Sequence, residues 1–558
     1  MRLIRATIRS RCTLHFKHIF REDLLRIALD RLQQRYSLLQ STVQLYMGQP
    51  YFALADDISR LRIPLHVLPL SYENQWQDIM NLEMNTRFKD GQPIMRCVLL
   101  LPPSSTSPAS PASPHRLCTL ILTVSHDAVD GKSTALLFSD LLDEYIALYR
   151  RACELRFIHD ASIDLVSSSS SSTTTTTRMT PPDATIITPE MLHCAEPSPK
   201  HDIPPPVDNL LPWWLPKPLY FAIHMVHFLW CHTFLLVMPG YLPYSASPTQ
   251  QRQMREQLLQ ALPPSLSAYA KQTEFDGQWT SAVLYRSISA DKTAKLVQRA
   301  KREGATVGCY VYSLVTNAVA EKVLASRPGA KSTRVWGVML IDMRPFALLY
   351  GGAKLPPLTS GQSQSALVPT AAGGFDNDSS NANTKTNTKT AIFRPNDVGV
   401  FISTIDYCNT VAHGDYTDDR RQWALARKVR ADLTRGLRLF KHLTSVVFAQ
   451  YLSVYAATLS RFFLRPHPCP SYSVSNLGVM DAPGSLIHRV STAFPHLHDA
   501  AVAVNSSCSF PMPLVTTMTF KGELRLVFSY TIETMSREYI EHLADLCETI
   551  VDHAIASE

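Results

Sequence analysis

Two side chains capable of acid–base chemistry, His126 and Asp130, lie four residues apart and are followed at once by Gly131. A neutral imidazole can accept a proton near neutral pH because its unperturbed pKa is about 6.5, so His126 is a candidate general base. Such a short spacing also arises by chance, and the alternative is a buried, hydrogen-bonded histidine that takes no part in chemistry. The elements around the motif are needed to choose between the two interpretations.

The motif is expected at a turn between a strand and a helix. Residues 117–124 form an apolar run rich in β-branched residues, which predicts a strand, and Lys132 begins an amphipathic pattern that predicts a helix ending near Arg150. Gly131 has no Cβ and so tolerates a sharp bend, and side chains at such a turn can project into a cleft. We therefore expect His126 to be accessible to a substrate.

Five further segments on both sides of the motif resemble helices and strands of one known superfamily. They are a helix and turn at 23–39, a helix that follows residues 304–307 and ends at 323, a strand at 335–345 that carries Arg344, a helix at 423–430, and a strand at 474–478 that carries Ser475 and Asn476.

In order and spacing, these segments and the motif resemble the acyltransferase superfamily of chloramphenicol acetyltransferase, peptide-synthetase condensation domains, polyketide-associated acyltransferases and alcohol acetyltransferases. The hallmark of that superfamily is the sequence H-x-x-x-D-G. The resemblance implies an α/β (α+β) fold of two chloramphenicol-acetyltransferase-like half-domains. Each half-domain is expected to be a mixed sheet flanked by helices, with an active-site channel between the two.

The resemblance also implies a role for each candidate site residue. His126 is the expected catalytic base, while Asp130, beside Gly131, is expected to be structural and to pair with Arg344 from the second half-domain. The strand at 474–478 resembles the superfamily's crossover strand, so Ser475 and Asn476 are candidate hydrogen-bond donors to the oxyanion or the substrate. The alternative for these two residues is that they only cap a strand.

The resemblance leaves three functions open. The first is an acyl-CoA-dependent O-acyltransferase acting on a small or lipidic alcohol, with acyl-CoA as cosubstrate and no permanently bound cofactor. The second is a condensation-type enzyme that uses carrier-protein thioesters, which Ser125 disfavours because it replaces the first of the paired histidines common in condensation domains. The third is a catalytically silent, membrane-associated binding protein of the same fold.

The composition narrows the classes of partner and site. Lys and Arg number 54 and Asp and Glu 47, a net charge of +7 that is spread along the chain, so nucleic-acid binding is not expected. The 11 cysteines form no C-x-x-C pair, which indicates reduced, buried thiols and neither a disulfide framework nor a metal site. We expect a monomer facing a reducing compartment.

With 558 residues the chain suits two half-domains and insertions. The expected boundaries are 1–155 for the N-terminal half-domain, 156–209 for a low-complexity, disordered linker, 210–247 for a hydrophobic insert, and 248–558 for the C-terminal half-domain with a low-complexity insertion at 351–390. Residues 102–114 are expected to form a Ser/Pro-rich hairpin loop.

Residues 210–243 are apolar enough to meet a bilayer, and the run between residues 219 and 238 contains no Asp, Glu, Lys or Arg. A spanning helix needs roughly 20 mostly apolar residues, and three histidines lower the hydropathy of this run. An interfacial helix or hairpin and a buried interdomain helix therefore remain alternatives. A membrane contact would place the protein on the cytoplasmic side of the endoplasmic reticulum or lipid-droplet membrane. A zinc site from His224, His227 and His232 is not expected, since no carboxylate or cysteine lies at a spacing that would complete it.

Overall fold

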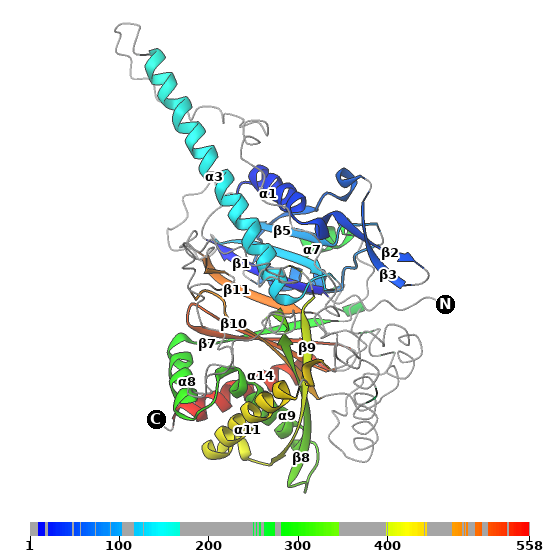
Figure 1. Cartoon of the computed structure of the whole chain (residues 1–558), viewed down its shortest axis with the longest axis vertical. Coiled ribbons are helices and arrows are strands. Elements are labelled where there is room, and N and C mark those ends of the chain that lie inside the picture. The colour runs from blue at the N-terminus through cyan, green and yellow to red at the C-terminus, as the bar shows by residue number, and fades with distance from the viewer. Residues whose placement is uncertain are drawn as a thin grey trace, which may run out of the picture.

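The chain forms two lobes, each built on a mixed β-sheet, as the sequence predicted (Figure 1). The computed structural model describes residues 9–16, 20–46, 49–102, 117–167, 262–273, 281–344, 401–443, 471–482, 497–504 and 512–556, apart from a few positions within these ranges and with a few isolated residues outside them.

The sheet of the first lobe is centred on β6, all eight residues of which are buried. Its spatial order is β11 (Leu497–Val504), β1 (Arg9–Phe16), β6 (Cys118–Ser125), β5 (Met95–Leu101) and β4 (Leu65–Pro69). All neighbours are antiparallel except the parallel pair β4 and β5. A separate hairpin is formed by β2 (Ser41–Tyr46) and β3 (Gln49–Leu54). The expected loop at 102–114 joins the antiparallel strands β5 and β6, and most of it lies outside the described residues.

Helices cover both faces of this sheet. On one face, α1 (Glu22–Arg35) packs against α3 (Gly131–Ser167), with Leu24, Leu25 and Leu29 of α1 fully or almost fully buried. The other face is covered by α2 (Gln75–Asn85), which shares a core cluster with Val98 of β5. Because successive residues of a strand point to opposite faces, Cys97 and Leu99 belong instead to the cluster of α1 and α3.

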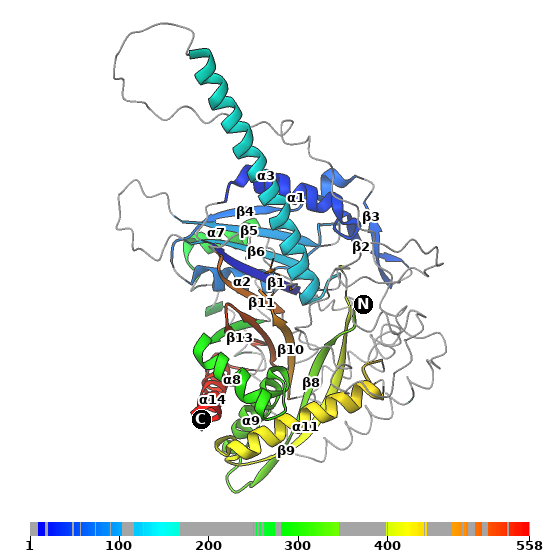
Figure 2. The same cartoon turned by 60° about the vertical axis from the view of Figure 1, so that its left-hand side comes forward.

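The helix after the motif is longer than the sequence predicted. It continues to Ser167 instead of ending near Arg150, so residues 156–167 of the expected linker are helical. No Gly or Pro occurs between residues 151 and 167, and nothing in that stretch stops a helix. Figures 1 and 2 show this helix continuing past the sheet and away from the two lobes.

The sheet of the second lobe has six strands. Its spatial order is β7 (Ala282–Ile288), β13 (Glu523–Tyr530), β12 (Leu514–Phe520), β10 (Tyr472–Val479), β8 (Ser332–Asp342) and β9 (Ile402–Ala412). The pairs of β10 with β12 and with β8 are parallel, and the others are antiparallel. Since β8 pairs with β9, the expected insertion at 351–390, which lies outside the described residues, connects two neighbouring strands.

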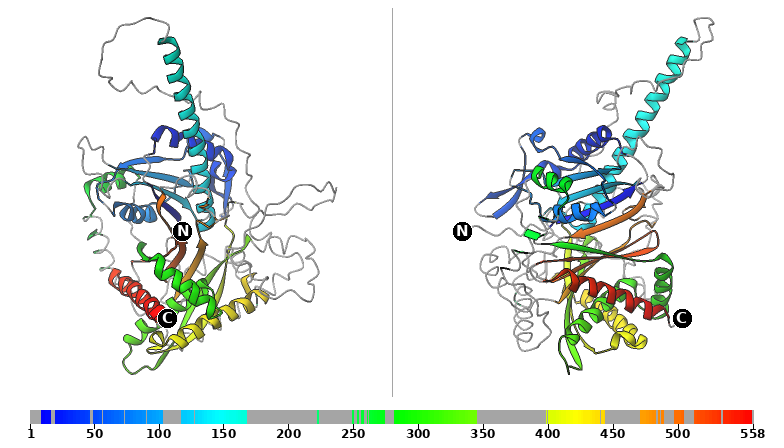
Figure 3. Two further views of the ribbon diagram at one scale, coloured as in Figure 1. Left: turned by 90° about the vertical axis from the view of Figure 1, so that its left-hand side faces the viewer. Right: turned by 180° about the vertical axis from the view of Figure 1, so that it is seen from behind.

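Helices cover the side of the second sheet that is remote from the first lobe (Figure 3). They are α8 (Ala290–Arg302), α9 (Val307–Ala325), α11 (Asp419–Arg438) and α14 (Arg537–Ala556). The predicted helix start after residues 304–307 is confirmed, because the Thr306 side chain accepts a hydrogen bond from the Cys309 amide and caps α9.

The strand that passes from the second half of the sequence into the first lobe is β11, which pairs with β1 along its length. The expectation that residues 474–478 form the crossover strand is therefore wrong. Those residues belong to β10, which lies inside the second sheet. The β11 strand also contacts β12 and β13, so it forms part of the boundary between the two lobes.

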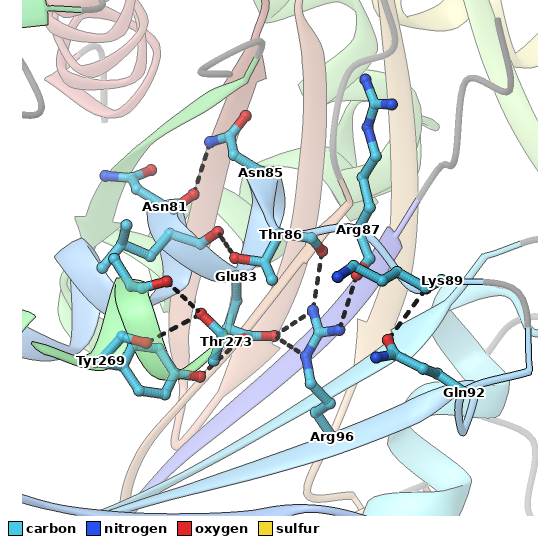
Figure 4. A network of polar contacts seen from close by, with 12 residues as sticks. Asn81, Glu83, Asn85, Thr86, Arg87, Lys89, Gln92, Arg96, Tyr269 and Thr273 are labelled. Atoms are coloured by element: carbon cyan, nitrogen blue, oxygen red, sulfur yellow. Dashed lines mark hydrogen bonds and ion pairs between the residues drawn. The ribbon is translucent and has the colours of Figure 1, made fainter. Parts of the chain in front are cut away.

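A buried polar network joins the first lobe to the chain that leads into the second (Figure 4). Arg96 of β5 donates to the Glu83 carboxylate of α2 at 3.1 and 3.0 Å, and the hydroxyl of Tyr269, in the helix α7 (Pro264–Gln272), donates to the same carboxylate at 2.6 Å. The Asn85 side chain exchanges two hydrogen bonds with the backbone of Ser281, next to β7. These contacts hold α7 and the beginning of β7 against the first lobe.

None of the described helices is long and apolar enough to cross a membrane. The hydrophobic stretch 210–243 lies almost wholly outside the described residues, so its three interpretations remain predictions.

Candidate functional site

The motif forms the expected turn between a strand and a helix. The β6 strand ends at Ser125, whose carbonyl accepts hydrogen bonds from the amides of Ala128 (3.1 Å) and Val129 (3.2 Å). His126 is the first residue of this tight turn and is partly buried. The turn thus presents the imidazole at the end of a fully buried strand.

Asp130 ends the turn and caps the following helix. Its Oδ1 accepts the amide proton of Ser133 at 2.8 Å, and its carbonyl accepts that of Thr134 at 2.9 Å. Aspartate is favoured in this position because it satisfies amides at the beginning of a helix that have no partner within the helix.

Asp130 also connects the turn to the second lobe. Arg344 Nη2 lies 3.0 Å from Asp130 Oδ1 and 2.6 Å from the Ser133 hydroxyl, and the Phe401 amide donates to Asp130 Oδ2 at 2.9 Å. The side chains of Asp130 and Arg344 are 1% and 2% exposed. The contact between these residues, which the sequence predicted, is therefore present and buried.

The charges of this cluster are mutually compensated. Burial by itself raises the pKa of Asp130, but the charge of Arg344 and the hydrogen bonds from Arg344, Ser133 and Phe401 outweigh it and hold that pKa below its usual value. Burial likewise lowers the pKa of Arg344, and Asp130 and Asp342 more than offset this effect. Both side chains are therefore ionised at neutral pH.

Gly131 does not act as the sequence analysis expected. It is the first residue of α3 and is not among the described glycines with positive φ, so the turn does not require a left-handed residue there. By contrast, Gly478 in β10 does adopt a left-handed conformation, with a φ of 76°.

A pocket between the two lobes brings together His126 and Ser475. Three of its described lining residues have polar side chains: His126, Ser475 and Thr516. The remaining lining residues, apart from Gly131, are aliphatic: Leu340, Ile402, Leu477, Val502, Val504 and Leu514. The pocket therefore combines an imidazole and two hydroxyls with apolar walls.

Asn476 does not line this pocket. Its Oδ1 accepts the amide proton of Gly478 at 2.9 Å, and its Nδ2 would lie 2.5 Å from a Cβ placed on Gly308, at the beginning of α9. Ser475 and Asn476 are consecutive in β10, so their side chains point to opposite faces of the sheet. Asn476 instead stabilises a bulge, since the register of β10 with β12 shifts between Asn476 and Val479.

Thr516 is a pocket residue that the sequence analysis missed. It is 1% exposed, and its hydroxyl has no hydrogen-bond partner among the described residues. Its place in the pocket follows from the parallel pairing of β10 and β12, in which Ser475 and Thr516 are direct partners. No local pattern in the sequence reveals that pairing.

Two other expectations concern cysteines and metals. Cys97, Cys118, Cys309 and Cys547 are buried free thiols, as expected, whereas Cys153 and Cys408 are exposed. Within the part of the chain that the structure describes, no three His, Cys, Asp or Glu side chains gather where they could hold a metal ion.

No protein-family model and no curated protein matches the chain. Many solved structures match it, including three that do so over nearly its whole length. Trichothecene 15-O-acetyltransferase from Fusarium sporotrichioides has a TM-score of 0.57 and 11% identity, covering 99% of this chain and 92% of its own. The first condensation domain of the calcium-dependent antibiotic synthetase has a TM-score of 0.52 and 13% identity, covering 99% and 92%. Polyketide synthase associated protein 5 from Mycobacterium tuberculosis has a TM-score of 0.50 and 13% identity, covering 98% and 94%.

These similarities show the fold of the chain. The two-lobed architecture that the sequence predicted, with a mixed sheet in each lobe, is confirmed by solved structures that cover both lobes.

Proposed function

We propose that this protein transfers an acyl group from acyl-CoA to the hydroxyl of an apolar alcohol, with His126 as the general base. The observation that carries the proposal is the pocket between the lobes, in which His126 and Ser475 share apolar walls. The fold supports it as well, because the structures that resemble this chain include an acetyltransferase and a condensation domain.

The proposed reaction moves one proton in each of two steps. As the acceptor oxygen bonds to the thioester carbon, the acceptor hydroxyl gives its proton to His126 and the carbonyl electrons move onto the carbonyl oxygen. When the tetrahedral intermediate collapses, the C–S bond breaks and the imidazolium returns the proton to the departing thiolate. Ser475 is a candidate donor of a hydrogen bond to the oxyanion. No covalent acyl-enzyme is needed.

Asp130 is proposed to position the turn and not to move a proton. Its Oδ1 already accepts from Ser133 and Arg344, and its Oδ2 accepts from the Phe401 amide. A carboxylate held by these donors fixes the end of the turn, and therefore the direction from which His126 enters the pocket.

The aliphatic walls of the pocket favour an apolar acceptor, since they would strand polar groups of a hydrophilic one without partners. Such alcohols partition into membranes. A contact of residues 210–243 with the surface of the endoplasmic reticulum or a lipid droplet is therefore part of the proposal, and it rests on the sequence alone.

The test is thiol release by the purified full-length chain. Acetyl-CoA and longer acyl-CoAs are supplied as donors, each with a series of aliphatic, aromatic and sterol alcohols and with amines as the alternative acceptor class. We expect thiol release that depends on an alcohol, together with formation of the matching ester detected by mass spectrometry.

Two outcomes would overturn the proposal. If acyl groups are transferred only from carrier-protein thioesters, the chain is a condensation-type enzyme. If no donor supports transfer but apolar alcohols bind, the chain is a catalytically silent binding protein.

A further inference from the structure

Thr516 carries a buried hydroxyl for which the described residues provide no partner. The residue is 1% exposed, and its Oγ1, which solvent does not reach, makes no hydrogen bond to any described residue. Buried polar groups are hydrogen-bonded in the great majority of cases, so an exception calls for a missing partner. Thr516 lines the pocket with His126, so a substrate that widens the pocket as it binds and uncovers this hydroxyl can supply that partner.

The position of Thr516 relative to the other polar groups limits what this partner can be. In the parallel pair β10 and β12, Ser475 lies directly beside Thr516, so the two side chains share one face of the sheet. The other lining side chains of the described part, His126 apart, are aliphatic and cannot bond to a substrate oxygen. A polar atom of a substrate that enters this pocket near His126 therefore meets these two hydroxyls.

We propose that Thr516 is a second hydroxyl donor to the acyl group. Its Oγ1–H donates a hydrogen bond to the carbonyl oxygen of the bound thioester, and this hydrogen bond becomes stronger as that oxygen becomes the oxyanion. The inference rests on the proposed acyl transfer. A hydroxyl kept without a partner in the empty pocket is ready to bond to that oxygen without first breaking a bond within the protein.

The adjacent residue, Thr517, provides a matched control. It is also 1% exposed and its hydroxyl likewise has no partner among the described residues, but it points to the opposite face of β12 and does not line the pocket. A change of Thr517 to Val therefore removes a comparable hydroxyl from the same strand without touching the pocket.

The experiment compares Thr516→Val, Thr516→Ser and Thr517→Val with the wild type in the full-length chain, using an acyl-CoA and alcohol pair that the wild type accepts. Valine preserves the shape of threonine and removes the hydroxyl, whereas serine keeps the hydroxyl. We expect Thr516→Val to lower kcat about 10²- to 10³-fold with little change in KM, as for other lost oxyanion donors. Thr516→Ser keeps the hydroxyl donor, and Thr517→Val leaves the pocket unchanged. Each variant should therefore retain kcat within about threefold of the wild type.

The midpoint of thermal unfolding separates this role from a structural one. Thr516→Val should unfold at the wild-type temperature or above, since it removes a hydroxyl that is unpaired in the empty pocket. If Thr516→Val does not fold, Thr516→Ala takes its place, and Thr516→Ser must then exceed Thr516→Ala in kcat by at least about tenfold.

The inference is overturned if Thr516→Val retains the kcat of the wild type, if only its KM rises, or if Thr517→Val loses as much activity. In each case the acyl transfer of the wild-type protein remains established. If the wild type itself transfers no acyl group, the proposed function fails first and the inference fails with it.

Discussion

Arg344 Nη2 lies 3.0 Å from Asp130 Oδ1, although the two residues are 214 positions apart in the chain. Arg344 follows the end of β8 in the second lobe, and Asp130 ends the turn that carries His126 in the first. The ion pair therefore holds the turn against the second lobe. The Arg344 guanidinium also lies over the Phe401 ring, 4.6 Å from its centroid, which fixes its direction.

Removal of either partner of this pair should destabilise the fold. Arg344→Ala leaves the buried Asp130 carboxylate without a cation, and Asp130→Ala leaves the buried Arg344 with only the partly exposed Asp342. We expect a loss of about 3–5 kcal/mol in the free energy of unfolding for Arg344→Ala and a loss of up to that size for Asp130→Ala, measured by denaturant titration. Arg26→Ala is the control, because its pair with Glu22 is exposed and should contribute less than about 1 kcal/mol. If Asp130→Ala is as stable as the wild type and only its rate falls, Asp130 is a catalytic residue and the positioning role is wrong.

Gly337 in β8 should not tolerate a side chain. A Cβ there would collide with the Tyr312 hydroxyl and with the ring and hydroxyl of Tyr472, all in the core of the second lobe. Gly337→Ala should therefore lower the free energy of unfolding by about 1–3 kcal/mol, the usual result of overpacking. Gly436→Ala in α11 is the matched control, since its Cβ would meet Ile405 at an ordinary 3.4 Å and alanine favours a helix. Equal unfolding midpoints for the two variants would contradict the packing described around Gly337.

The buried His15 should make the fold sensitive to acid. Burial lowers its pKa to about 3, with further contributions from His498 and Arg525, and its Nδ1 lies 2.9 Å from the Thr119 hydroxyl. The unfolded chain has a histidine pKa of about 6.5, so it binds the proton more readily than the folded chain does. Stability is therefore fully present above about pH 6.5 and falls as the pH drops from there toward 3.

His15→Asn should remove this contribution. The free energy of unfolding of the variant, measured between pH 7 and pH 4, should fall less steeply than that of the wild type, by up to about 1.4 kcal/mol per pH unit. Parallel curves for the two proteins would mean that His15 is not the group responsible.

The hydrophobic stretch 210–243 should bind membranes. We expect the protein to sediment with membranes and to resist release by high salt, because apolar burial is not screened by ions. Replacement of Phe221, Phe228, Leu229 and Leu235 by polar residues should release it in folded form. Unfolding of that variant would favour a buried connector, and a wild-type chain found only in the supernatant would end the membrane interpretation.

Local patterns were sufficient to predict the elements next to the motif, because alternation, apolar periodicity and capping residues act over a few positions. The strand before His126 and the helix capped by Thr306 are examples. The opposite directions of Ser475 and Asn476 were also readable, since a strand alternates its side chains. The end of α3 was placed too early, near Arg150, although no Gly or Pro stops the helix before Ser167.

Long-range pairing could not be read in this way. The passage of β11 into the first sheet depends on its register with β1, and the place of Thr516 in the pocket depends on the pairing of β12 with β10. These pairings join segments that are distant in the chain, and the residues concerned carry no distinctive type or spacing. The hydroxyl of Thr516 becomes notable only once its surroundings are known.

The central claim, that His126 is the base for acyl transfer, is tested most directly by His126→Ala. The steady-state rate of alcohol-dependent thiol release from acyl-CoA is compared with that of the wild type, with the unfolding midpoint measured on the same samples. We predict an unchanged midpoint and a rate lowered about 10²- to 10⁴-fold, the usual loss when a general base is removed. A folded His126→Ala protein that releases thiol at the wild-type rate would contradict the mechanism.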